Sequence, residues 1–123
     1  MIGNEKYNIN TDIKFEALQL IDVQQLSNQC QEKWFNQTLC QVNDSVVRLG
    51  IIQGEFHWHK HDKEDELFYV ISGKLFVEVE GREIELTPNQ GFMVPREVLH
   101  RTRAPERTVM LMMSGCTVTP VGD

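Results

Sequence analysis

The chain has 123 residues, of which 41% are hydrophobic and 24% charged, and its formal net charge is −6. This length and composition are typical of one soluble globular domain with a real core, so we expect residues 1–123 to form a single domain. The acidic balance argues against a nucleic-acid partner, because such binding depends largely on basic residues that neutralise phosphates. No apolar run reaches the roughly 18 to 20 residues that would span a bilayer. The N-terminus has no signal-like pattern either, so we expect a cytoplasmic protein without a membrane partner.

The first third of the chain is expected to contain one short helix. Residues 1–12 are polar and are predicted to form a loose N-terminal arm. The run FEALQL, residues 15–20, alternates like a short strand. Asp22 followed by Gln25 has the spacing of a helix start, and apolar residues follow at helical intervals, which predicts a helix near residues 22–33.

From Trp34 onward the apolar period changes from that of a helix to that of strands. Turn residues separate the runs, and the pairs Asn43-Asp44 and Gly81-Arg82 each predict a hairpin. Eight or nine strands at spacings of about ten residues predict an all-β sandwich or barrel. The expected strands are FNQTLCQV (35–42), SVVRLGII (45–52), ELFYVIS (66–72), KLFVEVE (74–80), EIEL (83–86), FMVP (92–95), HRTRA (100–104) and TVMLMM (108–113).

The run GEFHWHKHDKEDELFYVISG, residues 54–73, contains three of the four histidines at alternate positions: His57, His59 and His61. If EFHWHKH is a strand, these histidines face one way while Phe56 and its alternate neighbours face the other. Imidazoles two residues apart, with Cα atoms roughly 6.5 to 7 Å apart, can converge on one ion, and a nearby carboxylate can complete the site. The alternative is an exposed charged loop. We disfavour it because the apolar run LFYVIS follows almost directly.

This stretch resembles the first conserved motif of the cupins, approximately G-(x)5-H-x-H-(x)3-4-E-(x)6-G. The residues that fit this spacing are His59, His61, Glu66 and Gly73. Gly54 lies one residue closer to the first histidine than the motif requires. An alternative register that starts at His57 and uses Glu64 puts the closing glycine eight residues after the acid. The spacing to that glycine therefore favours the first register.

The second cupin motif, G-(x)5-P-x-G-(x)2-H-(x)3-N, is matched in part by NQGFMVPREVLHRTRA. Pro95 and His100 stand where the motif requires them. Asn89 replaces the first glycine, Glu97 the second, and Ala104 the final asparagine. Asn89 can adopt a left-handed conformation. Glu97 does so less readily, which predicts that the turn before His100 departs from the family shape.

The resemblance covers about residues 46–113 and implies a double-stranded β-helix barrel of the jelly-roll type that binds one divalent metal ion. The ligands that it implies are His59, His61, Glu66 and His100. This set suits Fe, Mn, Ni, Co or Zn and leaves open positions for water or substrate. Because the ligands must be deprotonated, we predict that metal affinity falls as the pH drops through the histidine range near about 6.5.

Strand alternation predicts which other side chains lie near the ion. The candidate pocket residues are His57, Phe68 and Thr102, and Val70 should extend the apolar wall. His57 contacts the ligands or the substrate, or else lies at the barrel mouth and bonds to water. Arg101 and Arg103 should point away from the ion, as surface charges or in a subunit contact, although they are also candidates to bind an anionic substrate.

The sulfur-containing residues are predicted to have no chemical role. The three cysteines, Cys30, Cys40 and Cys116, are widely spaced and lack a C-x-x-C pair, which indicates reduced packing residues. The alternating methionines near the C-terminus are expected to fill the core. They are Met110, Met112 and Met113.

The resemblance implies a metal-binding cupin, and such proteins include dioxygenases, isomerases and lyases. We therefore expect a metal-dependent enzyme that acts on a small polar, chelating molecule, with Glu66 as a ligand rather than a free base. The alternative is a non-catalytic module that binds or senses a small ligand or the metal itself. Cupins commonly pair, so a homodimer is also expected.

Overall fold

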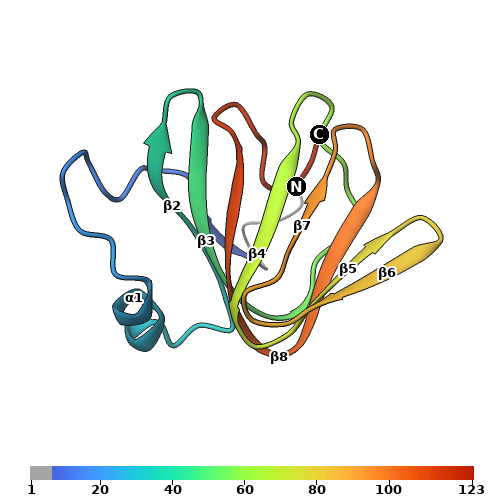
Figure 1. The fold of residues 1–123 in the computed structure, drawn as a ribbon, viewed down its shortest axis with the longest axis horizontal. Helices are drawn as coiled ribbons and strands as arrows, with labels where there is room; N and C mark the ends of the chain where they lie inside the picture. The colour runs from blue at the N-terminus through green and yellow to red at the C-terminus, as the bar shows by residue number, and fades with distance from the viewer. Residues whose placement is uncertain (1–6) are drawn as a thin grey trace.

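The computed structural model describes residues 7–123, whose strands build one curved sheet that folds back on itself (Figure 1). The elements are β1 (Asn8–Asn10), α1 (Val23–Gln29), β2 (Trp34–Val42), β3 (Ser45–Glu55), β4 (Glu66–Ser72), β5 (Leu75–Val79), β6 (Arg82–Leu86), β7 (Gly91–Val94) and β8 (His100–Gly115). The strand order in the described chain is β1-β2-β3-β8-β4-β7, and β5 pairs with both β8 and β6. This is the all-β jelly roll with one short helix that the sequence predicts.

The long strand β8 joins the two halves of the sheet. Residues 100–103 pair with β5, and residues 109–114 pair with β4. β3 runs beside both parts, and its register with β8 shifts between Ile52 and Gly54. The sequence predicts two strands separated at Pro105, and that prediction is wrong. The proline falls in the register shift, where the ladder requires no hydrogen bond from its nitrogen.

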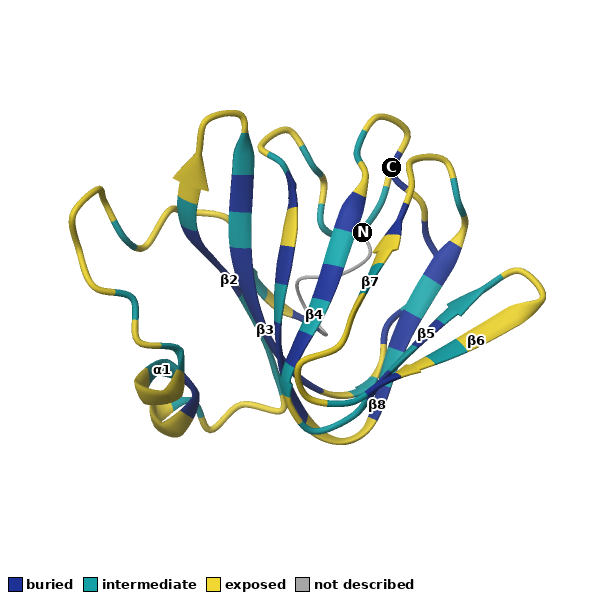
Figure 2. Cartoon of the chain, in the orientation of Figure 1, coloured by how far each residue is buried: buried dark blue, intermediate teal, exposed yellow. Residues whose placement is uncertain are grey.

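The core has two parts, one on each face of β3. The interior cluster consists of Ile52, Phe68, Val70, Leu75, Val77, Leu86, Val94, Ala104, Met110 and Met112. On the opposite face, Leu49 and Ile51 pack with Leu39 and Val109 beneath the N-terminal segment. Figure 2 shows the central strands largely buried and α1 largely exposed. Burial on both faces explains why β3 reads as a nearly continuous apolar run.

Helix α1 is capped at both ends by polar contacts. The carboxylate of Asp22 accepts a hydrogen bond of 3.0 Å from the backbone N–H of Gln25, the N-cap expected from the sequence. At the other end, Arg107 of β8 donates to the backbone carbonyls of Ser27 and Cys30, both at 2.9 Å. The helix therefore ends earlier than predicted and is fastened directly to the barrel.

Residues 15–20 do not form the predicted strand. Leu18 adopts a φ of 69° and is fully exposed, so a turn interrupts the alternation. Phe15 packs against the outer core cluster, and its backbone N–H donates to the carbonyl of Leu39 at 2.8 Å. The tertiary contact of one aromatic ring thus overrides the local pattern.

The predicted loose arm is partly ordered. Residues 8–10 form β1, which pairs in parallel with β2. Tyr7 is buried, with its ring centroid 4.8 Å from that of Trp34 and 4.5 Å from that of Phe56. The prediction for residues 1–6 lies outside the described part of the chain.

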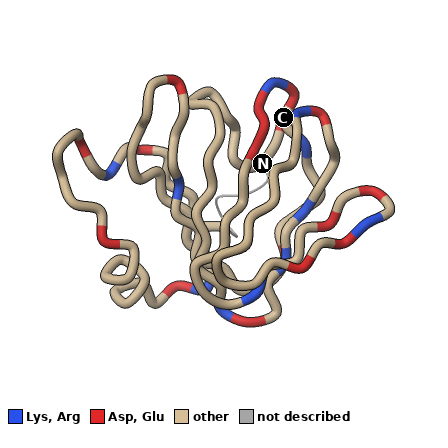
Figure 3. Tube along the Cα trace, in the orientation of Figure 1, with Lys and Arg blue, Asp and Glu red and all other residues tan. Residues whose placement is uncertain are grey.

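Charged residues lie mostly on loops and on the β5-β6 hairpin, where both signs are mixed (Figure 3). Arg96, for example, lies 3.4 Å from the carboxylate of Asp65. No helix in residues 7–123 combines the length and the apolar character that crossing a bilayer requires.

Gly73 allows the chain to turn tightly after β4, and we expect its replacement to be costly. Its φ is 89°, and a Cβ atom there would lie 2.6 Å from the carbonyl oxygen of Arg107 and 2.7 Å from Cα of Thr108. Gly73→Ala should therefore lower the free energy of unfolding by about 3 kcal/mol, because a backbone clash adds to left-handed strain. Urea denaturation measures the loss.

Gly81→Ala is the matched control for this variant. Gly81 has a similar φ of 78°, but nothing lies within 4 Å of the added Cβ. Its replacement should cost only the left-handed strain, about 1 kcal/mol. Equal losses for the two variants would contradict the assigned clash.

Candidate metal centre

Four buried side chains of metal-ligand type gather inside the barrel: His59, His61, Glu66 and His100. One potential ligand atom from each lies within 4.8 Å of the other three. Glu66 opens β4 and His100 opens β8, while the other two histidines lie in the segment that follows β3. The structure thus brings together the four residues of the favoured register. Glu64, the acid of the alternative register, binds the hydroxyl of Thr117 instead.

Backbone hydrogen bonds hold His59 beside His100. The N–H of each donates to the carbonyl of the other, at 2.9 and 2.8 Å, and the ring centroids are 4.3 Å apart. Each imidazole also donates from Nδ1 to a carbonyl two residues earlier, that of His57 or Val98, at 2.9 Å. These bonds fix the tautomer in which Nε2 carries a free lone pair for a metal.

Besides His61 Nδ1, three buried atoms in the cluster lack a hydrogen-bond partner in the described chain: His61 Nε2, His100 Nε2 and Glu66 Oε1. The carboxylate oxygen lies 3.2 Å from the first nitrogen and 3.6 Å from the second, but neither contact has the geometry of a hydrogen bond. Buried polar atoms without partners are costly. A divalent ion bound among them would satisfy all three, so the residues present fit the metal that the fold implies.

The surroundings hold two of these ligands in the deprotonated form. Burial, reinforced by the neighbouring His100 and His61, lowers the pKa of His59 to about 4. Burial raises the pKa of Glu66, but its contacts with His100 and His61 outweigh that effect and lower the pKa to about 2. Both groups are therefore ready to bind a cation at neutral pH.

The turn before His100 keeps the left-handed conformation despite its missing glycines. Asn89 has a φ of 70°, as expected for asparagine, and Glu97 has a φ of 69°. The departure of this turn from the family shape stays a prediction. The N–H of Glu97 donates to the carbonyl of His61 at 2.8 Å, which ties this turn to the histidine segment and offsets the strain.

The histidine segment is not the strand predicted for residues 55–61, because regular pairing ends at Glu55. His59 forms only an isolated bridge. Phe56, predicted to face away from the histidines, is buried, and its ring centroid lies 5.0 Å from that of His59. Strict alternation is therefore wrong at this residue.

A small cavity of about 30 Å³ adjoins the cluster, with room for roughly two water molecules. Phe68 and Thr102 lie in its wall, where the sequence places them. The polar lining residues are Asn36, Arg48, His59, Glu66 and Thr102. The apolar lining residues are Trp34, Ile52, Phe56, Phe68, Met110, Met112, Val118 and Pro120.

Other expectations for this wall need correction. Val70 is fully buried in the interior core, but it is not among the residues that line the cavity. Met113 is exposed, unlike the two core methionines. Arg48 and Asn36 escaped the sequence reasoning altogether. The signal in the sequence was a single arginine in the apolar run SVVRLGII. It stands two and four residues before inward-facing positions of the same strand, so strand alternation turns it inward as well.

The C-terminal segment, residues 116–123, forms part of the cavity wall. Val118 and Pro120 supply part of the lining. His57 Nε2 donates to the carbonyl of Val121 at 2.6 Å. His57 thus bonds to this segment and is not among the residues that line the cavity, and its part in the site stays a prediction. Its ring centroid is still 5.3 Å from that of His59.

The same segment continues along the histidine stretch. Gly122 has a φ of 99°, and a Cβ atom there would lie 2.5 Å from Cβ of His59, so only glycine fits without a shift. Asp123 donates its N–H to the carbonyl of Lys60 at 2.9 Å and accepts from the N–H of Asp62 at 2.6 Å. These contacts hold the C-terminal residues against the histidine stretch.

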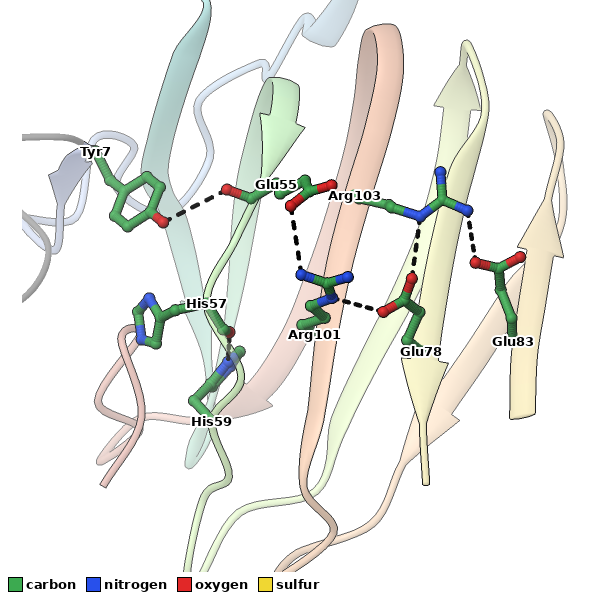
Figure 4. Close-up of polar contacts among 8 residues, drawn as sticks. All are labelled: Tyr7, Glu55, His57, His59, Glu78, Glu83, Arg101 and Arg103. Carbon is green, nitrogen blue, oxygen red and sulfur yellow. Dashed lines mark hydrogen bonds and ion pairs between the residues drawn. The ribbon is translucent and has the colours of Figure 1, made fainter. Parts of the chain in front are cut away.

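Arg101 and Arg103 form ion pairs with nearby carboxylates. Glu78 accepts from Nε of both arginines, at 2.5 and 3.0 Å. Glu55 and Glu83 extend the network at its two ends, at 3.3 and 2.5 Å (Figure 4). Both guanidinium groups are thus neutralised within the barrel wall, which supports the surface-charge interpretation. The homodimer, and any part they have in it, stays a prediction.

Together, the jelly-roll sheet and the buried cluster define a small all-β protein with a candidate metal centre in its interior. The family model for the cupin domain matches residues 47–115, and the chain belongs to the cupin family. It is 39% identical to the uncharacterized protein YdbB of Bacillus subtilis over 87 residues, which make up 70% of this chain and 77% of that protein.

Solved structures agree with the fold. The chain is similar to a cupin-2 domain containing protein from Shewanella frigidimarina, with a TM-score of 0.72 and 26% identity over 76% of this chain and 92% of that one. It is also similar to KdgF from Halomonas sp., with a TM-score of 0.65 over 73% of this chain and 87% of that one. At 22% identity, the second likeness concerns the fold alone.

Proposed function

We propose that this protein is a metal-dependent enzyme that acts on a small polar molecule able to chelate the bound ion. The observation that carries the proposal is the set of three buried, unpaired ligand atoms of His61, Glu66 and His100. A purely structural barrel has no use for four buried groups of this kind beside a cavity with a polar side.

The residues of the chain have distinct parts in this proposal. His59, His61, His100 and Glu66 would hold the ion. When bound, such an ion polarises a coordinated oxygen and orients a chelating substrate or, if it is iron, activates dioxygen. Glu66 serves as a ligand rather than a general base, because its pKa lies far below neutral.

The rest of the cavity wall would select and shelter the substrate. The hydroxyl of Thr102 and the amide of Asn36 are placed to orient polar groups, because both residues line the cavity. The apolar part of the wall includes the aromatic rings of Trp34, Phe56 and Phe68, which would keep water out of the cavity.

A non-catalytic role is the second candidate, and one observation favours it. The cavity has a volume of only about 30 Å³ and is lined in part by Val118 and Pro120, which leaves little room for a substrate while the C-terminal segment stays in place. A module that binds the metal ion, or a ligand of two or three heavy atoms, would need no more space.

Elemental analysis of protein purified without added metal tests both candidates. We expect about one divalent ion per chain, because the cluster has one set of four ligands. Oxygen uptake and product analysis with diols, thiols and keto acids then follow for the iron-loaded form. Substrate-dependent oxygen uptake would favour a dioxygenase, and turnover without it an isomerase or lyase.

The remaining outcomes decide against the enzyme. Bound metal without turnover of any compound would favour the binding module. A protein that takes up no divalent ion would overturn the enzyme and the metal-binding module, and would leave only a module that binds a small ligand without a metal.

A further inference from the structure

We propose that Arg48, together with the metal centre, forms a binding site for a small carboxylate, so that the molecule this protein acts on is an anion. The inference rests on the proposed function and narrows it to a class of substrate. Arg48 lies on β3 and is 3% exposed, and it lines the same cavity as His59 and Glu66.

The guanidinium group of Arg48 is positioned by neutral groups. Its two terminal nitrogens donate to the hydroxyl of Thr38 and to the side-chain oxygen of Asn36. Among residues 7–123, no carboxylate lies within 4 Å of it in an ion pair, in contrast to Arg101 and Arg103. A buried guanidinium without a direct counterion is unfavourable, and hydrogen bonds to neutral oxygens compensate only in part.

Among the described residues, Glu66 is the only carboxylate in the cavity wall, and its charge already interacts with the other members of the candidate metal cluster. It acts on Arg48 from a distance, where it opposes the burial that lowers the pKa of that arginine to about 10. The same carboxylate contacts His61 and His100 in the candidate metal cluster. Glu66 therefore cannot serve as a close partner for the guanidinium.

The charges in the cavity point to an anionic ligand once an ion is bound. A divalent ion and Arg48 bring three positive charges, and Glu66 brings one negative charge, while the histidine ligands stay neutral. Two positive charges remain in a buried space, where unbalanced charge is costly. A carboxylate that reaches both the ion and the guanidinium offsets them, and the planar fork of arginine suits its two oxygens.

The neighbours of Arg48 favour a small ligand, because a small ligand displaces few of the side chains around it. Gly50, two residues along β3, leaves space for Met110 and Met112, whose terminal methyl groups would lie 2.9 and 3.0 Å from an added Cβ. These thioether side chains line the cavity and can repack when a ligand enters. Two- and three-carbon acids fit such a site better than bulky phosphate esters.

Calorimetric titration of the zinc-loaded protein with oxalate tests the inference, and uncharged oxamide of the same shape is the comparison ligand. Arg48→Met keeps the volume but removes the charge. We expect it to weaken oxalate binding by about 10- to 100-fold, the range for a hydrogen-bonded charge, while zinc content stays unchanged. Oxamide affinity should change little. Arg101→Gln, which alters a guanidinium outside the cavity wall, should bind oxalate like the wild type.

The outcomes separate this inference from the function on which it rests. Zinc binding with equal oxalate affinity in wild type and Arg48→Met, or with no oxalate binding at all, overturns the carboxylate site but leaves the metal centre standing. Failure to bind zinc overturns both. If Arg48→Met does not fold, Arg48→Lys keeps the charge without the fork, and we expect about tenfold weaker binding. Unchanged affinity in that variant would contradict a two-point contact with the carboxylate.

Discussion

Replacing His100 by alanine should lower the affinity for a divalent ion by at least about 100-fold, since even residues that only orient a ligand contribute 10- to 100-fold. His100 is 1% exposed, its Nε2 has no other partner in the described chain, and its Nδ1 is fixed by the carbonyl of Val98. No neighbouring side chain of the cluster can replace it, because the other three members are ligands themselves. Competition with a chelating dye and elemental analysis of the purified variant measure the loss.

His57→Ala is the matched control, since it removes the same kind of side chain two residues from a proposed ligand. His57 bonds to the carbonyl of Val121 and lies outside the four-residue cluster. We expect metal content close to that of the wild type. A loss as large as that of His100→Ala would mean that the other register is correct, and full retention of metal by His100→Ala would exclude the site.

The spacing of one short stretch was sufficient to propose three of the four clustered residues, and the second motif added His100. His59 and His61 stand at alternate positions, and Glu66 begins a strand whose end is marked by Gly73. That glycine has a physical reason for its place, because a side chain there would collide with the backbone of β8. A motif whose members each have such a reason transfers to a new chain better than composition does.

The sequence was less informative where segments distant in the chain meet. The alternation of strand β3 could not be extended through the histidines, because Gly54 has a φ of 122° and regular pairing ends at the next residue. The contact of Val121 and Gly122 with the histidine stretch depends on the path of the chain after β8, which no local pattern encodes. Arg48 left a visible signal, but only the structure shows that this residue lines the same cavity as Glu66.

Acid should destabilise the metal-free protein well before its carboxylates are protonated. His59 has a pKa of about 4 in the folded chain and an ordinary value of 6.5. Between these values the unfolded chain binds more protons than the folded one, so stability falls as the pH falls. The stabilisation is complete above pH 6.5, and about 3 kcal/mol is lost by pH 4, at roughly 1.4 kcal/mol for each unit. Below pH 4.5 the lowered pKa of Glu66 adds a further loss in the same direction.

Urea denaturation of chelator-treated protein at pH 7.0 and pH 4.5 measures this change, with His59→Gln as the comparison. The glutamine does not titrate, so its stability should fall less over the same interval. An equal fall in both proteins would show that His59 is not the group responsible. The low pKa also refines the expectation that metal affinity declines near pH 6.5, because protons compete for this ligand mainly below about pH 4. If the metal is released only near that lower pH, the reason is that burial already keeps the proton off His59 at higher pH.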